Sequence, residues 1–269
     1  MDSVPYFFAD SVAHLLPKKS IPPLAELTAC FWSFTVKTHS ERRLDYYLSI
    51  LESHGIVNCH LVPYFSYAET ERARYSSAGY SALPSRISLA DYLRGTPSPY
   101  LRIVDICVGS SFRALPRKGE LEILRGFLRN PLNANKTWTN IEIESNVYPI
   151  EELLELLRLP SQSVSAYGAF ANRESFIRWH LEHNKMLKEI RFPDLKTEYE
   201  CALLWSESKK AGNLRFKRQG YSYTQTRNKV VSELRSLGLD AVESEAENVE
   251  VEVKHATTGA TLSFINCYF

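Results

Sequence analysis

Charged side chains alternate with apolar ones in four short segments of the sequence, and they are the residues best placed to contact a partner. The segments cover residues 141–143, 164–167, 187–192 and 214–216. If their apolar side chains face inward from β-strands, the alternate side chains face outward. The outward set predicted in this way comprises Glu142, Glu144, Arg191, Arg215 and Lys217. This set is acidic on the first segment and basic on the last two, so it could orient a protein target of mixed charge.

The sequence carries no signature of catalysis or of metal binding. It contains no glycine-rich phosphate loop, nucleophile elbow or H-E-x-x-H pair. His180 and His183 are three residues apart, with Glu182 between them, but a third ligand is missing. The helix dipole favours solvent-facing histidines near a helix C-terminus, which explains the pair without a metal. We therefore expect no catalytic residues, no cofactor and no metal, although residues remote in sequence could still form an active site.

The charge balance argues against nucleic acid as a partner. The 269 residues include 32 Lys and Arg and 31 Asp and Glu, which gives a formal net charge of +1. Residues 209–229 are basic and contain no acid, whereas residues 240–252 are acidic and contain no base. The two segments can offset each other, so we interpret them as a balanced, solvated surface.

Cysteine usage and hydropathy predict a soluble intracellular protein. The five cysteines are scattered and form no C-x-x-C pair, which is typical of free thiols. The N-terminus has no basic region and carries Asp10 within its apolar stretch, so a secretory signal is not expected. No segment reaches the ~18 apolar residues of a membrane span. We expect a cytoplasmic or nuclear protein with no membrane partner.

The outward charges must be positioned by a recurring strand and helix. Helical patterns at 150–159, 173–183, 199–210 and 226–237 follow the four strand segments. Strand anchors recur at intervals of 23, 26 and 24 residues, from Ile141 to Val164, Val164 to Ile190 and Ile190 to Leu214. A period of roughly 20 to 29 residues is typical of short α/β repeats. The sequence therefore predicts an α/β fold with a parallel sheet.

The remaining segments extend this pattern in both directions. Leu101–Val108 is predicted as the first strand of the α/β domain, followed by a helix at 119–128. Residues 249–255 and 261–267 alternate around a turn and are predicted as a closing β-hairpin.

The segment before the α/β domain is predicted to be helical or irregular. Residues 40–53 carry leucines and a tyrosine at helical spacing, which predicts a helix. Residues 59–65 are apolar but contain Pro63, which predicts an edge or irregular strand. Three regions result: a helical head at 1–40, a connecting region at 41–98 and an α/β domain at 99–269.

The first 40 residues resemble the F-box, a small helical module. The resemblance is carried by Val4 and Pro5, the Leu15–Leu16 pair, Leu24, Leu27 and Trp32. In that family the module docks on a Skp-type adaptor of a cullin-based ubiquitin ligase, and a following repeat region selects the substrate. The resemblance implies that these residues, apart from Leu16, make the contact with the adaptor.

An F-box-like head before leucine-rich-repeat-like units also resembles large protein families that are expanded in nematodes. This resemblance implies a short helical N-terminal head, an irregular leucine-rich-repeat-like α/β solenoid with a parallel sheet, and a C-terminal β-hairpin cap. The implied function is that of a non-catalytic, protein-binding adaptor in a ubiquitin ligase. Two alternatives remain open. One is an interaction scaffold unrelated to ubiquitin, whose head only caps the repeats, and the other is an unrecognised enzyme.

Overall fold

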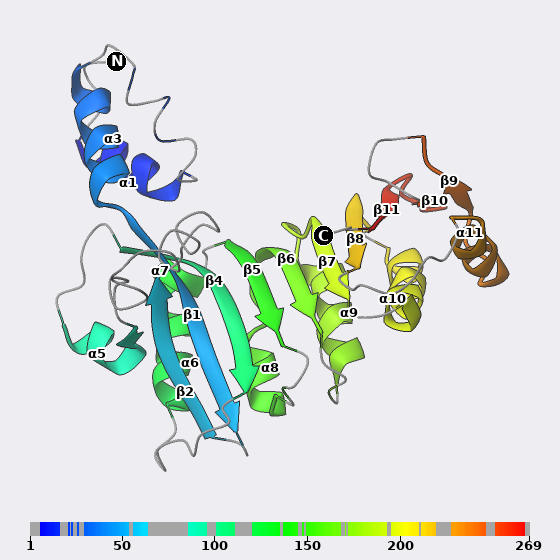
Figure 1. The fold of residues 1–269 in the computed structure, drawn as a ribbon, viewed down its shortest axis with the longest axis horizontal. Helices are drawn as coiled ribbons and strands as arrows, with labels where there is room; N and C mark the ends of the chain where they lie inside the picture. Colours follow the sequence, from blue (N-terminus) through cyan, green and yellow to red (C-terminus); the bar gives the residue numbers. More distant parts are fainter. Residues whose placement is uncertain are drawn as a thin grey trace, which may run out of the picture. The chain divides into compact units, whose positions relative to one another are not determined.

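The structure, a computed structural model, forms two compact units (Figure 1). The first comprises residues 1–48 and 60–104, and the second comprises residues 49–59 and 105–269. The structure describes residues 6–16, 21, 23, 26, 30–53, 56–63, 86–95, 101–110, 120–134, 137–144, 147, 149–167, 170, 172–192, 195–209, 211–218, 227–245 and 251–266. The boundaries predicted at 40/41 and 98/99 stay predictions.

The second unit is built on a sheet in which successive strands lie side by side. The parallel neighbours are, in order, β4 (Leu101–Ser110), β5 (Trp138–Ile143), β6 (Ser161–Ala166), β7 (Glu189–Phe192) and β8 (Leu214–Arg218). The predicted parallel arrangement of the four strand segments is therefore confirmed. The fold is mixed α/β with a mostly parallel sheet.

Beyond β8 the sheet continues with strands from the C-terminal segment. β11 (Thr261–Asn266) pairs with β8 in parallel, and β10 (Val251–Lys254) pairs with β11 antiparallel. A further short strand, β9 (Ala241–Glu243), pairs antiparallel with β10. The sequence patterns had not predicted β9, which lies at the end of the strand order.

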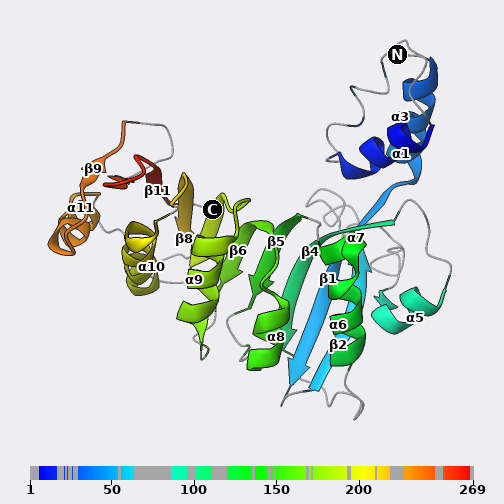
Figure 2. The same cartoon turned by 180° about the vertical axis from the view of Figure 1, so that it is seen from behind.

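Helices follow the parallel strands along the chain. They are α6 (Leu121–Arg129), α7 (Pro131–Ala134), α8 (Glu151–Leu156), α9 (Arg173–His183), α10 (Leu195–Glu207) and α11 (Arg227–Ser236). The helices predicted after these strands are confirmed, with ends shifted by a few residues. Figure 2 shows α6, α8 and α9 in front of the sheet, so these three helices cover the same face.

Apolar side chains that are in register across the strands form the core under these helices. The row consists of Ile106, Ile141, Val164, Ile190, Phe216 and Phe264, each at most 1% exposed. Leu214 and Ile143 are also buried, as the predicted alternation requires. Burying each such side chain contributes about 1.5–3 kcal/mol to folding, so this row is a main source of the sheet's stability.

The predicted helix at 40–53 is wrong, because a strand occupies most of this segment. β1 (Leu44–Ser53) follows α3 (Cys30–Arg42) directly. Tyr46, Leu48 and Ile50 are buried, while the residues between them are more exposed. The segment thus obeys the two-residue period of a strand, which its apolar residues also satisfy.

The expectation that Pro63 leaves an edge or irregular strand is also wrong. β2 (Ile56–Pro63) is a regular strand that lies between β1 and β3 (Ile87–Ser88) in the sheet order. Its pairing with β3 uses His60 and Leu61. Pro63 is the last residue of β2 and lies beyond that pairing, so its missing N–H group removes no bond from this ladder.

Two helices in the first unit pack through a small apolar cluster. α1 (Tyr6–Leu15) contacts α3, and Ala13, Ile21 and Val36 form the buried centre. A carboxylate–imidazole pair, Asp10 with His39 at 2.9 Å, links the same two helices. A third helix, α5 (Leu89–Arg94), follows β3. Among the described residues, no helix is long and apolar enough to cross a membrane.

Candidate functional site

The strands β4–β8 project polar side chains from the side of the sheet opposite to the buried apolar row. We call this surface the polar face. It comprises Asp105, Cys107, Asn140, Glu142, Glu144, Ser163, Ser165, Tyr167, Glu189, Arg191, Arg215 and Lys217. All five residues predicted to face outward belong to it. Residues from five strands thus meet on one surface, away from the helices in Figure 2.

Glu189 joins the basic residues of β7 and β8. Its carboxylate lies 2.7 Å from Arg191 Nε and 2.7 Å from Lys217 Nζ. Burial alone would raise the pKa of Glu189, but hydrogen bonds from Lys217 and Arg191 outweigh burial and lower it. Sequence reasoning missed Glu189, although it precedes the buried Ile190 and therefore faces outward. With Glu189 included, the outward side chains of β7 carry no net charge and only those of β8 are basic. The prediction that the outward side chains of both segments are basic is therefore wrong for β7.

The other end of the polar face is acidic. Glu142 is half-buried, and its carboxylate accepts a hydrogen bond from Asn140 Nδ2 at 3.3 Å. Burial raises the pKa of Glu142, and the neighbouring Glu144 raises it further, against the opposing effect of Arg191. Glu144 lies against Gly109, where an added Cβ would be only 2.9 Å from Glu144 Oε2. Glycine at this position therefore leaves room for the carboxylate.

Tyr167 and Ser165 occupy the middle of the polar face. Burial raises the pKa of the Tyr167 hydroxyl, against the opposing effects of the neighbouring Ser165 and Arg191. Ser165 Oγ donates to Asn140 Oδ1 at 3.3 Å. Tyrosine and arginine are the residue types that most often dominate the energetics of protein interfaces. Sequence reasoning missed Tyr167, which ended a predicted strand and was not assigned a direction.

Cys107 lies beside the acidic end, but it is not a nucleophile. Its thiol donates to Glu144 Oε1 at 3.7 Å. Burial raises the pKa of the Cys107 thiol to about 12, with further contributions from Glu142 and Glu144. The thiolate is the reactive form of cysteine, so Cys107 is inert at neutral pH.

We expect iodoacetamide to alkylate Cys107 at pH 8 at least about a hundredfold more slowly than an unperturbed thiol, because so little thiolate is present. Mass spectrometry of the peptide that contains Cys107 measures the rate. Unfolding in urea should restore normal reactivity. The substitutions Glu142→Gln and Glu144→Gln should leave labelling slow, because burial is the largest cause of the shift. Labelling of the folded protein at the rate of the unfolded one would contradict this assignment.

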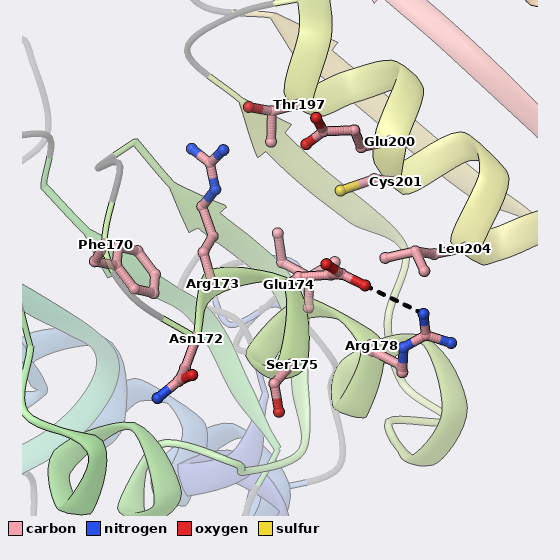
Figure 3. A pocket seen from close by; sticks show the side chains of 11 residues that line it. Phe170, Asn172, Arg173, Glu174, Ser175, Arg178, Thr197, Glu200, Cys201 and Leu204 are labelled. Atoms are coloured by element: carbon pink, nitrogen blue, oxygen red, sulfur yellow. Dashed lines mark hydrogen bonds and ion pairs between the residues drawn. The ribbon is translucent and has the colours of Figure 1, made fainter.

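A groove between α9 and α10 is the second candidate surface. Its volume is about 600 Å³, and its lining includes Phe170, Arg173, Glu174, Arg178, Glu200 and Cys201. Figure 3 shows these side chains on α9, on the segment before it and on α10. Arg178 pairs with Glu174 at 3.2 Å and lies 3.9 Å from Glu207. The lining carries two arginines and two glutamates, so its charges give no preference for an anion or a cation.

The predicted solvent exposure of His180 is wrong. His180 is completely buried, and its Nδ1 accepts a hydrogen bond from Asn184 Nδ2 at 3.2 Å. Burial lowers the pKa of His180 to about 3, and the positive charge of Arg158 adds to this effect. His183 is exposed, as predicted, and stacks on Trp179 with ring centroids 5.5 Å apart. The described residues include no group of three or more His, Cys, Asp or Glu that could hold a metal ion.

The residues assigned to adaptor docking are only partly described. Val4, Pro5, Leu24 and Leu27 lie outside the described residues, as does the side chain of Leu15 in α1. Trp32 is half-buried and packs against the Ala13 cluster. It also contacts Phe8 edge to face, with centroids 6.4 Å apart, and Phe8 is 56% exposed.

Comparisons with protein-family models, curated proteins and solved structures find no match to this chain. The function must therefore be inferred from the chain itself.

Proposed function

We propose that the chain is a non-catalytic, protein-binding adaptor that contacts a protein target through the polar face. The observation that carries this proposal is the register of β4–β8, which gathers charged side chains of both signs on one surface. Tyr167 and Arg191 at its centre add the residue types that anchor protein interfaces. Charges of both signs favour a protein target over a polyanion such as nucleic acid.

We propose further that the α/β unit is an irregular leucine-rich-repeat-like solenoid, closed by the hairpin of β10 and β11. Buried positions at i, i+3 and i+5 support this architecture. They occur as Ile103, Ile106 and Val108; Trp138, Ile141 and Ile143; Ser161, Val164 and Ala166; and Ala211, Leu214 and Phe216. The pattern recurs in β4, β5, β6 and β8, whereas Leu187 at the corresponding position before β7 is only partly buried. A recurring burial pattern is expected of stacked repeats, because each unit buries its apolar residues against its neighbours.

Site-specific photo-crosslinking tests the use of the polar face. A benzophenone amino acid at the exposed Arg215 should crosslink to a target protein in extracts of the source cells. The same amino acid at Glu182, exposed on α9, is the matched control and should not give that product. The crosslinked protein, once purified, should bind the full chain directly. Equal products from both positions would count against the polar face.

The head is proposed to dock on a Skp-type adaptor of a cullin-type ubiquitin ligase, as its resemblance to the F-box implies. The packing of α1 against α3, with Phe8 exposed beside Trp32, is compatible with a helical docking module. An adaptor of this kind would act in the cytoplasm or the nucleus.

Co-purification of the full chain with a purified Skp-type adaptor tests the docking of the head. Leu24→Asp should abolish retention, since a charge would enter an apolar contact. Unchanged retention would refute the assignment of Leu24. If the adaptor does not bind at all while the crosslink at Arg215 persists, the chain is an interaction scaffold unrelated to ubiquitin.

A further inference from the structure

We infer that the occupant of the polar face is a polypeptide segment that lies across the strands, with a basic side chain over Glu142 and Glu144 and an acidic side chain over Arg215 and Lys217. This inference rests on the proposed function and adds the chemistry and orientation of the target. It follows from the order of charges across the strands.

The charges of the polar face separate by strand. β4 contributes Asp105, and Glu142 and Glu144 lie on and just after β5, so the described residues of the polar face at this end carry only negative charge. β6 contributes serines and a tyrosine and is neutral. β7 contributes one acid and one base, and β8 contributes two bases, Arg215 and Lys217. The polar face is therefore a dipole with its axis across the strands.

Internal ion pairs do not cancel this dipole. Glu189 is shared by Arg191 and Lys217, which leaves one excess positive charge in that cluster. Arg215 is exposed and adds a second. At the other end, Glu142 accepts a hydrogen bond from the neutral side-chain amide of Asn140, which does not neutralise its charge.

The middle of the polar face carries no charge. Ser163, which is 8% exposed, lies in register between Asn140 and Glu189. Its Oγ is buried, and Ser165, whose Oγ is bonded to Asn140, is completely buried. A segment crossing here would therefore meet no charge between the two ends and would contact the partly exposed Tyr167.

The strand spacing sets the separation of the charges on the target. Neighbouring strands are about 4.8 Å apart, so the three steps from β5 to β8 span about 14 Å. An extended segment covers about 14 Å in four residues. A helix needs about nine residues for the same distance. The expected motif is thus a base and an acid at positions i and i+4 if the segment is extended. If the segment is helical, the two charges are expected about nine positions apart.

A display library of random 16-residue peptides, selected on the immobilised full chain, tests this inference. Recovered peptides should be enriched in a base and an acid at one of these two separations. A synthetic peptide of the enriched sequence, followed by fluorescence anisotropy, gives its affinity. Added salt should weaken its binding, because exposed charges are screened.

Paired substitutions separate the two ends of the polar face. Glu142→Gln with Glu144→Gln should remove the enrichment of bases, and Arg215→Gln with Lys217→Gln should remove the enrichment of acids. Each pair should weaken binding of the synthetic peptide by about two- to thirtyfold, the effect of two ion pairs near the protein surface. The matched control is Glu182→Gln with Lys185→Gln, two exposed residues on or just after α9. This pair should change neither the charge pattern of the recovered peptides nor the affinity of the synthetic peptide.

The outcomes separate this inference from the proposed function. Peptides that lack the charge pattern but lose binding through substitutions in the polar face would overturn the inference and leave the proposed function standing. Peptides insensitive to every substitution in the polar face would contradict both. The inference would also be overturned if no peptide is recovered, or if a fluorescent heparin probe binds the polar face in preference to the peptides. In either case the crosslink at Arg215 would decide the proposed function.

Discussion

Phe216→Ala is expected to lower the free energy of unfolding by about 3–5 kcal/mol, the typical cost of removing a buried phenylalanine side chain. Phe216 is completely buried in β8 and lies in register between Ile190 and Phe264. Its ring meets that of Phe264 edge to face, with centroids 5.6 Å apart, so the substitution also removes an aromatic pair. Urea denaturation followed by circular dichroism measures the change.

Arg215→Ala on the same strand is the matched control. Arg215 is exposed on the polar face, so its truncation should change the free energy of unfolding by no more than about 0.5 kcal/mol. The contrast between neighbouring residues tests the direction of every side chain on β8. A loss of less than about 1 kcal/mol for Phe216→Ala, or a larger loss for Arg215→Ala, would mean that the two faces have been exchanged.

The sheet of the second unit was predictable because its apolar residues obey two periods at once. Within a strand, Ile141 and Ile143 alternate with polar residues, and the same pattern returns after each helix. A three-residue step between buried residues precedes the alternation: Trp138 is buried three residues before Ile141, although strict alternation would place it outward. Sequence reasoning used only the alternation and therefore missed the inward direction of Trp138.

The local sequence did not decide between helix and strand for residues 44–53, because their apolar residues fit both a helical and a strand period. Tyr47, Leu48 and Leu51 share a helical face, but Tyr46, Leu48 and Ile50 also share a strand face. The choice depends on the neighbouring strands, since β1 lies between β2 and β4. Pairing partners that are distant in sequence thus decided the structure of this segment.

The polar face was only half predictable. The direction of Glu142 or Arg215 follows from alternation, but the ion pairs of Glu189 depend on which strands become neighbours and in which register. The burial of His180 could have been anticipated, because Phe176 lies four residues earlier on the same helical face. The sequence prediction weighed the helix dipole and omitted this spacing.

Acidification from pH 7 to pH 5 should lower the free energy of unfolding by about 2 kcal/mol through His180 alone. The pKa of His180 is about 3 in the folded chain, because burial disfavours the charged imidazole, against a usual value of 6.5. Well above pH 6.5 the group is neutral in both states and has almost no effect on stability. As the pH falls from 6.5 towards 3, the unfolded chain binds a proton that the folded chain does not, so stability is lost at up to about 1.4 kcal/mol per pH unit.

The variant His180→Gln isolates this contribution. Glutamine keeps a polar side chain near Asn184 but cannot take up a proton in this range, so the variant should lose about 2 kcal/mol less than the wild type between pH 7 and pH 5. Urea denaturation of both proteins at the two pH values measures the difference. Carboxylates contribute little above pH 5 and are common to both proteins. Equal losses in the two proteins would mean that His180 accepts a proton as readily in the folded chain as in the unfolded one, and would contradict a pKa of about 3.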